Sequence, residues 1–96
     1  MYNDLYAQSG TDIIRQLGSR FSEYRKRMGL TQIKVAEKSG LSLFTINTFE
    51  KGTATGLTLA SLIKLLRAID NLEEIEKLLP ELPESPRDLY FKTKKR

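Results

Sequence analysis

The side chains of this sequence that are most clearly grouped are cations, and the chemistry they favour is binding to a polyanion. Residues 15–51 contain eight Lys and Arg against three Glu, whereas residues 70–88 contain seven acidic residues against two basic ones. Four further cations lie at positions 92–96. Such segregation gives one pole that attracts polyanions and another that repels them, although ordinary solvated helix faces would produce the same pattern.

The sequence lacks the residue types that most often carry catalysis and metal binding. The sequence has no His and no Cys, so it lacks the commonest general base, the commonest metal ligand and any thiolate. Only carboxylates, Lys and Tyr remain for catalysis, and no group of carboxylates converges in the sequence. We therefore expect no enzyme, no metal site and no cofactor.

The chain length fits one domain, because compact domains of roughly 100 residues bury enough surface to fold alone. We predict an N-terminal extension at 1–10, a globular domain at 11–80 and a proline-containing, basic tail at 81–96. No segment approaches the ~20 apolar residues that cross a bilayer, and the N-terminus lacks the basic and apolar blocks of a signal peptide. These features predict a cytoplasmic protein without a membrane partner.

Apolar spacing and capping residues predict an all-α fold. The first helix spans 11–28 behind a Thr11 cap, and Gly29 ends it. Its expected buried stripe is Ile14, Leu17, Phe21, Tyr24 and Met28. The second helix spans 32–39, capped by Thr31 and closed by Gly40. The third follows a Ser42 cap over 43–50, with Ile46 and Phe49 facing the core.

Two further helices are expected beyond a flexible loop at 52–57. The fourth begins at a Thr58 cap and carries an apolar stripe of Leu59, Leu62, Ile63, Leu66 and Ile69. The fifth spans 72–79 and ends at Pro80, because proline breaks regular structure. Ser85 and Pro86 favour one more short turn through Tyr90.

Two short helices joined by a glycine turn form the helix-turn-helix arrangement. Residues 30–42 (LTQIKVAEKSGLS), Ile46 and the run Glu50-Lys51-Gly52 closely resemble the Xre/Cro family of phage and bacterial repressors, and Gly18 and Arg25 also fit that pattern. The resemblance covers residues 17–70. It implies a five-helix, λ-repressor-like domain and sequence-specific binding of double-stranded DNA. The implied protein is a transcriptional repressor that binds an inverted repeat as a homodimer.

The resemblance also implies residue roles. Base contacts are expected from the outward positions of the third helix, which are Leu43, Phe44, Thr45, Asn47 and Thr48, and the resemblance implies Leu43, Phe44 and Thr48 among them. Amides suit adenine, hydroxyls suit any base edge and apolar groups suit the thymine methyl. Phosphate contacts would come from Arg20, Gln32, Lys34, Lys38, Ser42, Lys51, Thr53, Thr55 and Thr58. Arg25 and Glu50 would form an ion pair that orients the third helix rather than touching bases.

Three alternatives stay open. Leu43 and Phe44, with Ile33 beside them, could form a protein-binding patch of a helical adaptor. The apolar residues Leu57, Leu65, Leu72, Ile75 and Leu79 are expected on a dimer face, but the fifth helix could instead cap the core of a monomer. The tail resembles small regulators encoded beside HipA-like kinase toxins. This resemblance suggests a third function, that of an antitoxin that binds a HipA-like toxin and represses its own promoter.

Overall fold

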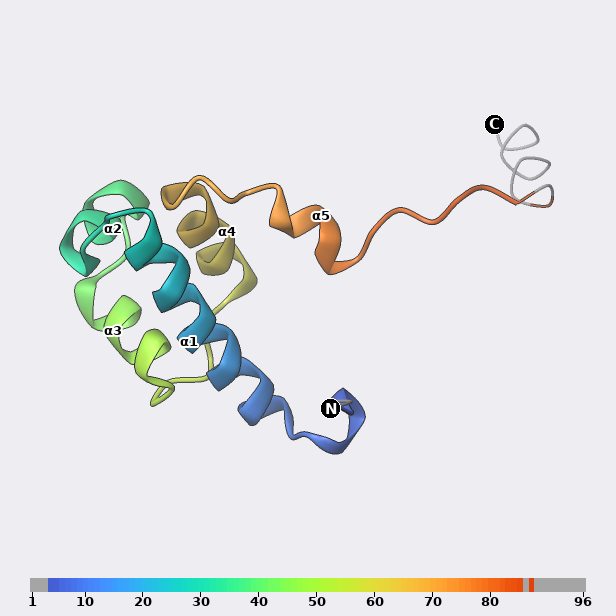
Figure 1. Ribbon diagram of the computed structural model, residues 1–96, viewed down its shortest axis with the longest axis horizontal. Helices are drawn as coiled ribbons and strands as arrows, with labels where there is room; N and C mark the ends of the chain where they lie inside the picture. The colour runs from blue at the N-terminus through green and yellow to red at the C-terminus, as the bar shows by residue number, and fades with distance from the viewer. Residues whose placement is uncertain (1–3, 86, 88–96) are drawn as a thin grey trace.

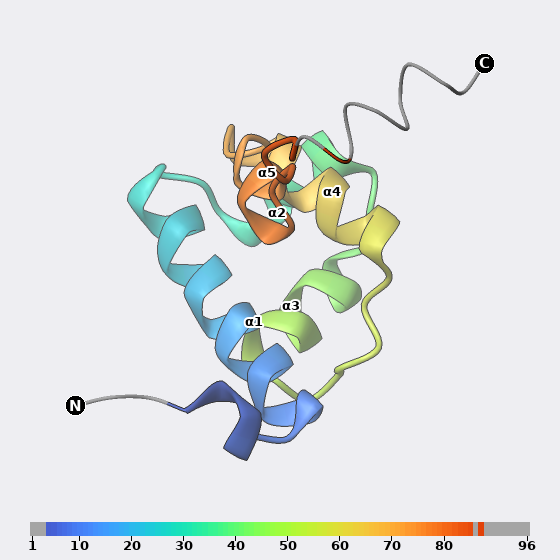
Figure 2. The same ribbon diagram turned by 90° about the vertical axis from the view of Figure 1, so that its right-hand side faces the viewer.

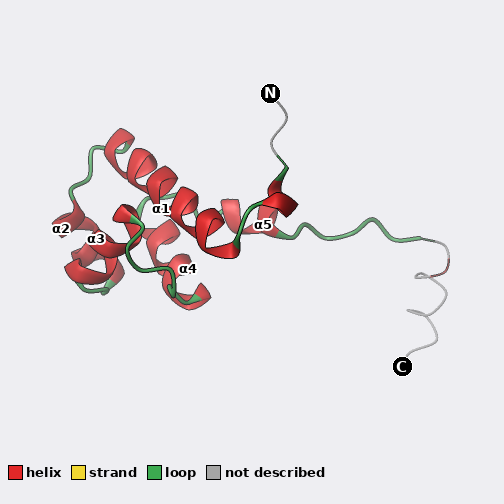
Figure 3. Cartoon of the chain, turned by 90° about the horizontal axis from the view of Figure 1, so that it is seen from below, coloured by secondary structure: helices red, strands yellow, loops and turns green. Residues whose placement is uncertain are grey.

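The computed structural model describes residues 4–85 and 87, and every regular element in that part of the chain is helical (Figures 1 and 3). A short 3-10 turn, η1, is followed by five α-helices. The elements are η1 Leu5–Ala7, α1 Gly10–Arg27, α2 Gln32–Ser39, α3 Leu43–Lys51, α4 Leu59–Ala68 and α5 Glu74–Leu78. The prediction of an all-α, five-helix fold is confirmed.

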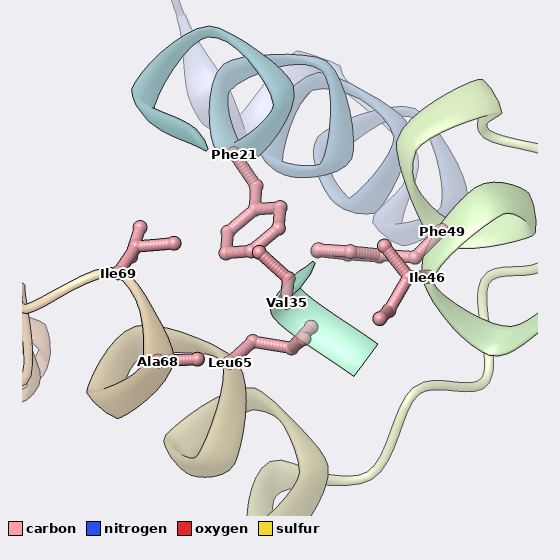
Figure 4. Close-up of a cluster of buried hydrophobic side chains, with 7 residues drawn as sticks. All are labelled: Phe21, Val35, Ile46, Phe49, Leu65, Ala68 and Ile69. Atoms are coloured by element: carbon pink, nitrogen blue, oxygen red, sulfur yellow. The ribbon is translucent and has the colours of Figure 1, made fainter. Parts of the chain in front are cut away.

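Helices α1 to α4 enclose one core, and each contributes to it (Figure 4). The seven buried apolar residues are Phe21, Val35, Ile46, Phe49, Leu65, Ala68 and Ile69. The rings of Phe21 and Phe49 meet at the centre, with their centroids 5.9 Å apart. Helix α1 packs mainly on α3 (Figure 2), and α2 packs on both α3 and α4. This arrangement leaves the outer surfaces of α2 and α3 uncovered.

The predicted caps of α2, α3 and α4 are confirmed, because the hydroxyls of Thr31, Ser42 and Thr58 each accept a hydrogen bond from a backbone N–H three residues on. The expected cap of α1 is wrong by two residues. Ser9 is the cap, its hydroxyl accepts from the Asp12 N–H at 3.0 Å, and Thr11 lies inside the helix.

The buried line of α1 also differs from the predicted stripe. The buried positions are Gly18, Phe21 and Arg25, whereas Leu17 and Tyr24 are 37% and 44% exposed. The reason is tertiary: α3 rests on the side of α1 that contains Gly18, so the apolar residues on the other side are only partly covered. Phe21 is buried as predicted and Ile14 packs against the core, so the predicted stripe is wrong at Leu17, Tyr24 and Met28, which is 46% exposed.

Helix α4 shows the same kind of difference. Leu65, Ala68 and Ile69 are buried, while Leu59 at the helix start is 58% exposed. Leu65, expected on a dimer face, is completely buried in the core of the single chain and cannot form an outer surface. Its position one turn before Ile69 turns it toward Val35 of α2, which faces α4 across the core (Figure 4).

The last helix is shorter than predicted. Leu72 and Glu73 lie in a turn after Asp70, whose φ is 59°, and α5 begins only at Glu74 without a side-chain cap. Leu79 ends α5 in a bend, with φ −152° and ψ 80°. Residues 79–85 then extend away from the bundle (Figures 1 and 3). Most of the expected turn through Tyr90 lies outside the described residues.

Candidate nucleic-acid interface

The turn between α2 and α3 is built by a glycine. Gly40 has a φ of 78°, a left-handed conformation that glycine adopts without steric cost. Its N–H donates to the Ala36 carbonyl at 2.9 Å, which closes α2 and lets the chain change direction into α3. The predicted glycine turn is confirmed, and it fixes the angle between the two helices.

Helix α3 is held from behind by the core and by α1. Ile46 and Phe49 are buried, as predicted, and Gly18 of α1 lies against the backbone of Phe49. A Cβ at Gly18 would lie 2.9 Å from the Phe49 carbonyl carbon and closer still to its oxygen. The absence of a side chain at Gly18 is therefore what lets α1 and α3 approach each other.

The ion pair implied for Arg25 and Glu50 is present. The Arg25 Nε–H donates to Glu50 Oε2 at 2.7 Å and an Nη2–H donates to Oε1 at 2.9 Å. A third guanidinium bond goes to the Leu30 carbonyl at 2.8 Å. Only 9% of the Arg25 side chain and 5% of the Glu50 side chain are exposed, so the bidentate pair joins α1 to the last turn of α3 inside the fold.

The surroundings keep both partners charged. Burial opposes ionisation of Glu50, but hydrogen bonds from Arg25 and Gln32, the charge of Arg25 and a bond from Ser22 outweigh it and lower the pKa of Glu50. The hydrogen bond to Glu50 in turn raises the pKa of Arg25 against the effect of burial. Charge-assisted, two-fold contacts of this kind fix orientation as well as adding energy.

Gln32 does not simply point outward at the start of α2. Its Nε2–H donates to Glu50 Oε1 at 2.9 Å, and its Oε1 accepts from Asn47 Nδ2 at 3.3 Å. Glu50, Gln32 and Asn47 therefore form a chain of hydrogen bonds that begins at Arg25. These two bonds use one amide N–H and the amide oxygen of Gln32, so its second N–H is left for the expected phosphate contact, which stays a prediction.

The outer side of α3 presents an apolar surface. Phe44 is 76% exposed, Leu43 is 44% exposed, and Ile33 of α2 adds a third exposed apolar side chain. The Thr48 hydroxyl donates to the Phe44 carbonyl at 2.8 Å, which leaves its oxygen as an acceptor. Thr45 is bonded to the Ser42 cap at 2.9 Å. None of the five predicted base-contacting residues carries a charge.

The predicted phosphate-contacting cations separate into two places. Lys34, Lys38 and Lys51 are exposed on α2 and at the end of α3. Arg20 is not brought to this surface, because it lines a groove between α1, α4 and α5. The predicted loop hydroxyls lie after α3: Thr53 donates to the Thr48 carbonyl at 3.5 Å, Thr55 is half-buried and Thr58 caps α4.

Arg15 is a cation that sequence reasoning counted but gave no role. Its Nε–H donates to the Gly52 carbonyl at 3.1 Å, at the carboxyl end of α3, and its Nη1 pairs with Asp12 at 3.2 Å. The contact spans 37 residues of sequence, so no local pattern would have revealed it. It places a partly exposed cation beside Lys51 and the loop that follows α3.

Groups that could hold a metal ion are absent among the described residues, and no helix in that part of the chain is long and apolar enough to span a membrane. Comparison with curated proteins and with solved structures gave no match. A family model described as Helix-turn-helix matches residues 21–75, which is more than half of the chain and includes α2, α3 and α4. The chain therefore belongs to the Xre/Cro, λ-repressor-type helix-turn-helix family of DNA-binding transcriptional regulators.

Proposed function

We propose that this protein is a sequence-specific transcriptional repressor that binds an inverted-repeat operator in double-stranded DNA as a homodimer, and that it has no enzymatic activity. The observation that carries the proposal is the outer face of α3, on which Leu43 and Phe44 are exposed while the inner face is fixed by the core and by Arg25. A fixed helix with an uncovered face is what insertion into the major groove requires.

The polar groups available on α3 favour adenine and thymine over guanine. Asn47 keeps one N–H and its carbonyl oxygen for an adenine edge, because only one amide hydrogen is needed for Gln32. Leu43 and Phe44 offer apolar contact to thymine methyl groups. Guanine is commonly read by Arg or Lys, and the predicted reading residues include neither.

Affinity then depends mainly on the phosphates. Lys34, Lys38 and Lys51 surround the reading surface, and Arg15 lies at the carboxyl end of α3. Cations in these positions release counterions from DNA when they bind, so binding weakens steeply as salt rises. The acidic segment containing α5 is remote in sequence from these cations and suits the side of the molecule that faces away from DNA.

The experiment is selection of bound duplexes from a random library, followed by gel shifts of the selected sequence at several salt concentrations. We expect two A/T-rich half-sites related by a two-fold axis, and log K that falls linearly with log salt. Replacing Lys51 with Ala should lower the steepness by about 1 for each protomer bound. Failure to enrich any duplex at low salt would contradict the proposal.

The adaptor alternative makes the opposite prediction. If Leu43 and Phe44 form a protein-binding patch, the selection should enrich no duplex. The antitoxin alternative rests on the tail, of which residues 86 and 88–96 lie outside the described part of the chain. The selection experiment separates the adaptor from the repressor directly. Capture of a kinase-like partner would be a separate measurement.

A further inference from the structure

A groove in the bundle is lined by no residue of α2 or α3. It lies between α1, α4 and α5 and has a volume of about 270 Å³. Its apolar lining includes Leu17, Tyr24, Leu62, Leu66, Ile75 and Leu78. Arg20 stands at the same groove, and no acidic partner of Arg20 is found within residues 4–85. Glu74 and Lys77 also line the groove and pair with each other at 3.3 Å, so Arg20 is the cation there whose charge has no partner within the described residues.

The segment that follows α5 exposes apolar side chains to solvent. Leu79 and Leu82 are 88% and 87% exposed, although both are large and apolar. They stand in the run Leu79-Pro80-Glu81-Leu82-Pro83, in which each proline disfavours the helical region for the residue before it. In an extended proline-rich chain with about three residues per turn, positions three apart project on the same side. Leu79 and Leu82 then form one apolar edge, and Glu81 lies on another.

The groove and the segment fit each other chemically. The apolar edge matches the lining of the groove, and Glu81 supplies the acidic partner that Arg20 lacks. We propose that residues 79–83 of one copy occupy the α1–α4–α5 groove of a second copy, reciprocally, so that each protomer of the dimer gives one arm and receives one. The inference rests on the proposed homodimeric repressor and identifies its dimer interface.

The segment cannot easily fill the groove of its own chain. Leu78 already lines the groove, so the chain would have to reverse within the next residues. Pro80 disfavours the helical region for Leu79, which has φ −152° and ψ 80°, so α5 does not continue into the arm. The arm accordingly heads away from the bundle (Figures 1 and 3). A partner related by a two-fold axis receives it without any reversal, and a two-fold axis closes the contact at two copies.

The absence of cysteine in the sequence makes a clean cross-linking test possible. Tyr24→Cys places a thiol at the groove and Leu82→Cys places one on the arm, both at exposed positions. Mixing the two single variants under mild oxidation should give a disulfide-linked dimer. Lys38→Cys on α2, away from the groove, mixed with Leu82→Cys is the matched control. A yield no higher than this control would overturn the proposal.

Two further measurements separate the possible outcomes. The Tyr24→Cys, Leu82→Cys double variant should cross-link between chains, and a cross-link within one chain would overturn exchange. By light scattering, wild type should be a dimer and the Leu79→Ser, Leu82→Ser variant a folded monomer by circular dichroism. If that variant stays dimeric while wild type binds its selected duplex, the arm is refuted and the repressor stands. If no duplex is bound by wild type, the proposed function itself has failed.

Discussion

Adding one methyl group at Gly18 tests whether the position of α3 depends on its close approach to α1. In Gly18→Ala, the new Cβ would lie 2.9 Å from the Phe49 carbonyl carbon. Carbon atoms in ordinary contact are about 3.5 Å apart, so α1 and α3 must separate by at least about 0.6 Å. The obstacle is backbone, which cannot rotate away as a side chain would. The same movement displaces Arg25 and Phe49 from their partners.

The magnitude follows from two opposing effects. Overpacking a core costs about 1–3 kcal/mol, and a clash with backbone belongs at or above the upper end of that range. Alanine regains about 1 kcal/mol of helix propensity relative to glycine. The net expected loss is about 2 kcal/mol in the free energy of unfolding, or roughly 8–16 °C in melting temperature for a domain of this size.

The assay is thermal unfolding followed by circular dichroism, with Gly10→Ala as the matched control. Gly10 lies in the same helix, and a Cβ there meets nothing within 4 Å. Gly10→Ala should therefore leave the melting temperature unchanged or raise it slightly. Equal melting temperatures for Gly18→Ala and wild type would refute the claim that close approach of α1 and α3 depends on this glycine.

Three further predictions concern the ion pair and the reading face. Arg25→Ala leaves the Glu50 carboxylate buried without its cation and should cost ~3–5 kcal/mol of stability; unchanged melting with lost DNA binding would instead make Arg25 a DNA contact. Because the pKa of Glu50 is lowered in the fold, its stabilisation is complete above the unfolded value near ~4.3 and is lost as pH falls through the folded pKa. Denaturant titrations from pH 6 to 3 should give a shallower fall in stability for Glu50→Gln than for wild type, and an equal fall in both would contradict this. Phe44→Ala should weaken binding of the selected duplex by roughly 1 kcal/mol or more per half-site and relax preference at one base pair, with melting unchanged; equal affinity for all duplexes would rule out Phe44 as a reader.

The helix-turn-helix itself was predictable because its signals are local. Thr31, Gly40 and Ser42 each act within four residues of their own position, through a cap or a left-handed turn. The bounds of α2 follow directly from them. A resemblance that extends over residues 17–70 added the Arg25–Glu50 pair, which no local pattern contains.

What could not be predicted depends on contacts between distant segments. The inner face of α1 is set by where Gly18 meets Phe49, and the burial of Leu65 is set by where α4 meets α2. The bond from Gln32 to Glu50 joins residues 18 positions apart, which no local pattern reveals. Arg15 at Gly52 was missed for the same reason. Periodicity reports that a face is buried, whereas tertiary packing decides which one.

The central claim is that α3 reads duplex DNA from the major groove in two symmetry-related copies. Hydroxyl-radical footprinting of the selected duplex tests it most directly, because protection shows both position and spacing on the two strands. We predict two protected half-sites on one face of the duplex, with centres about 34 Å or one helical turn apart. A single protected half-site would contradict the dimer, and uniform cleavage at every salt concentration would contradict DNA recognition altogether.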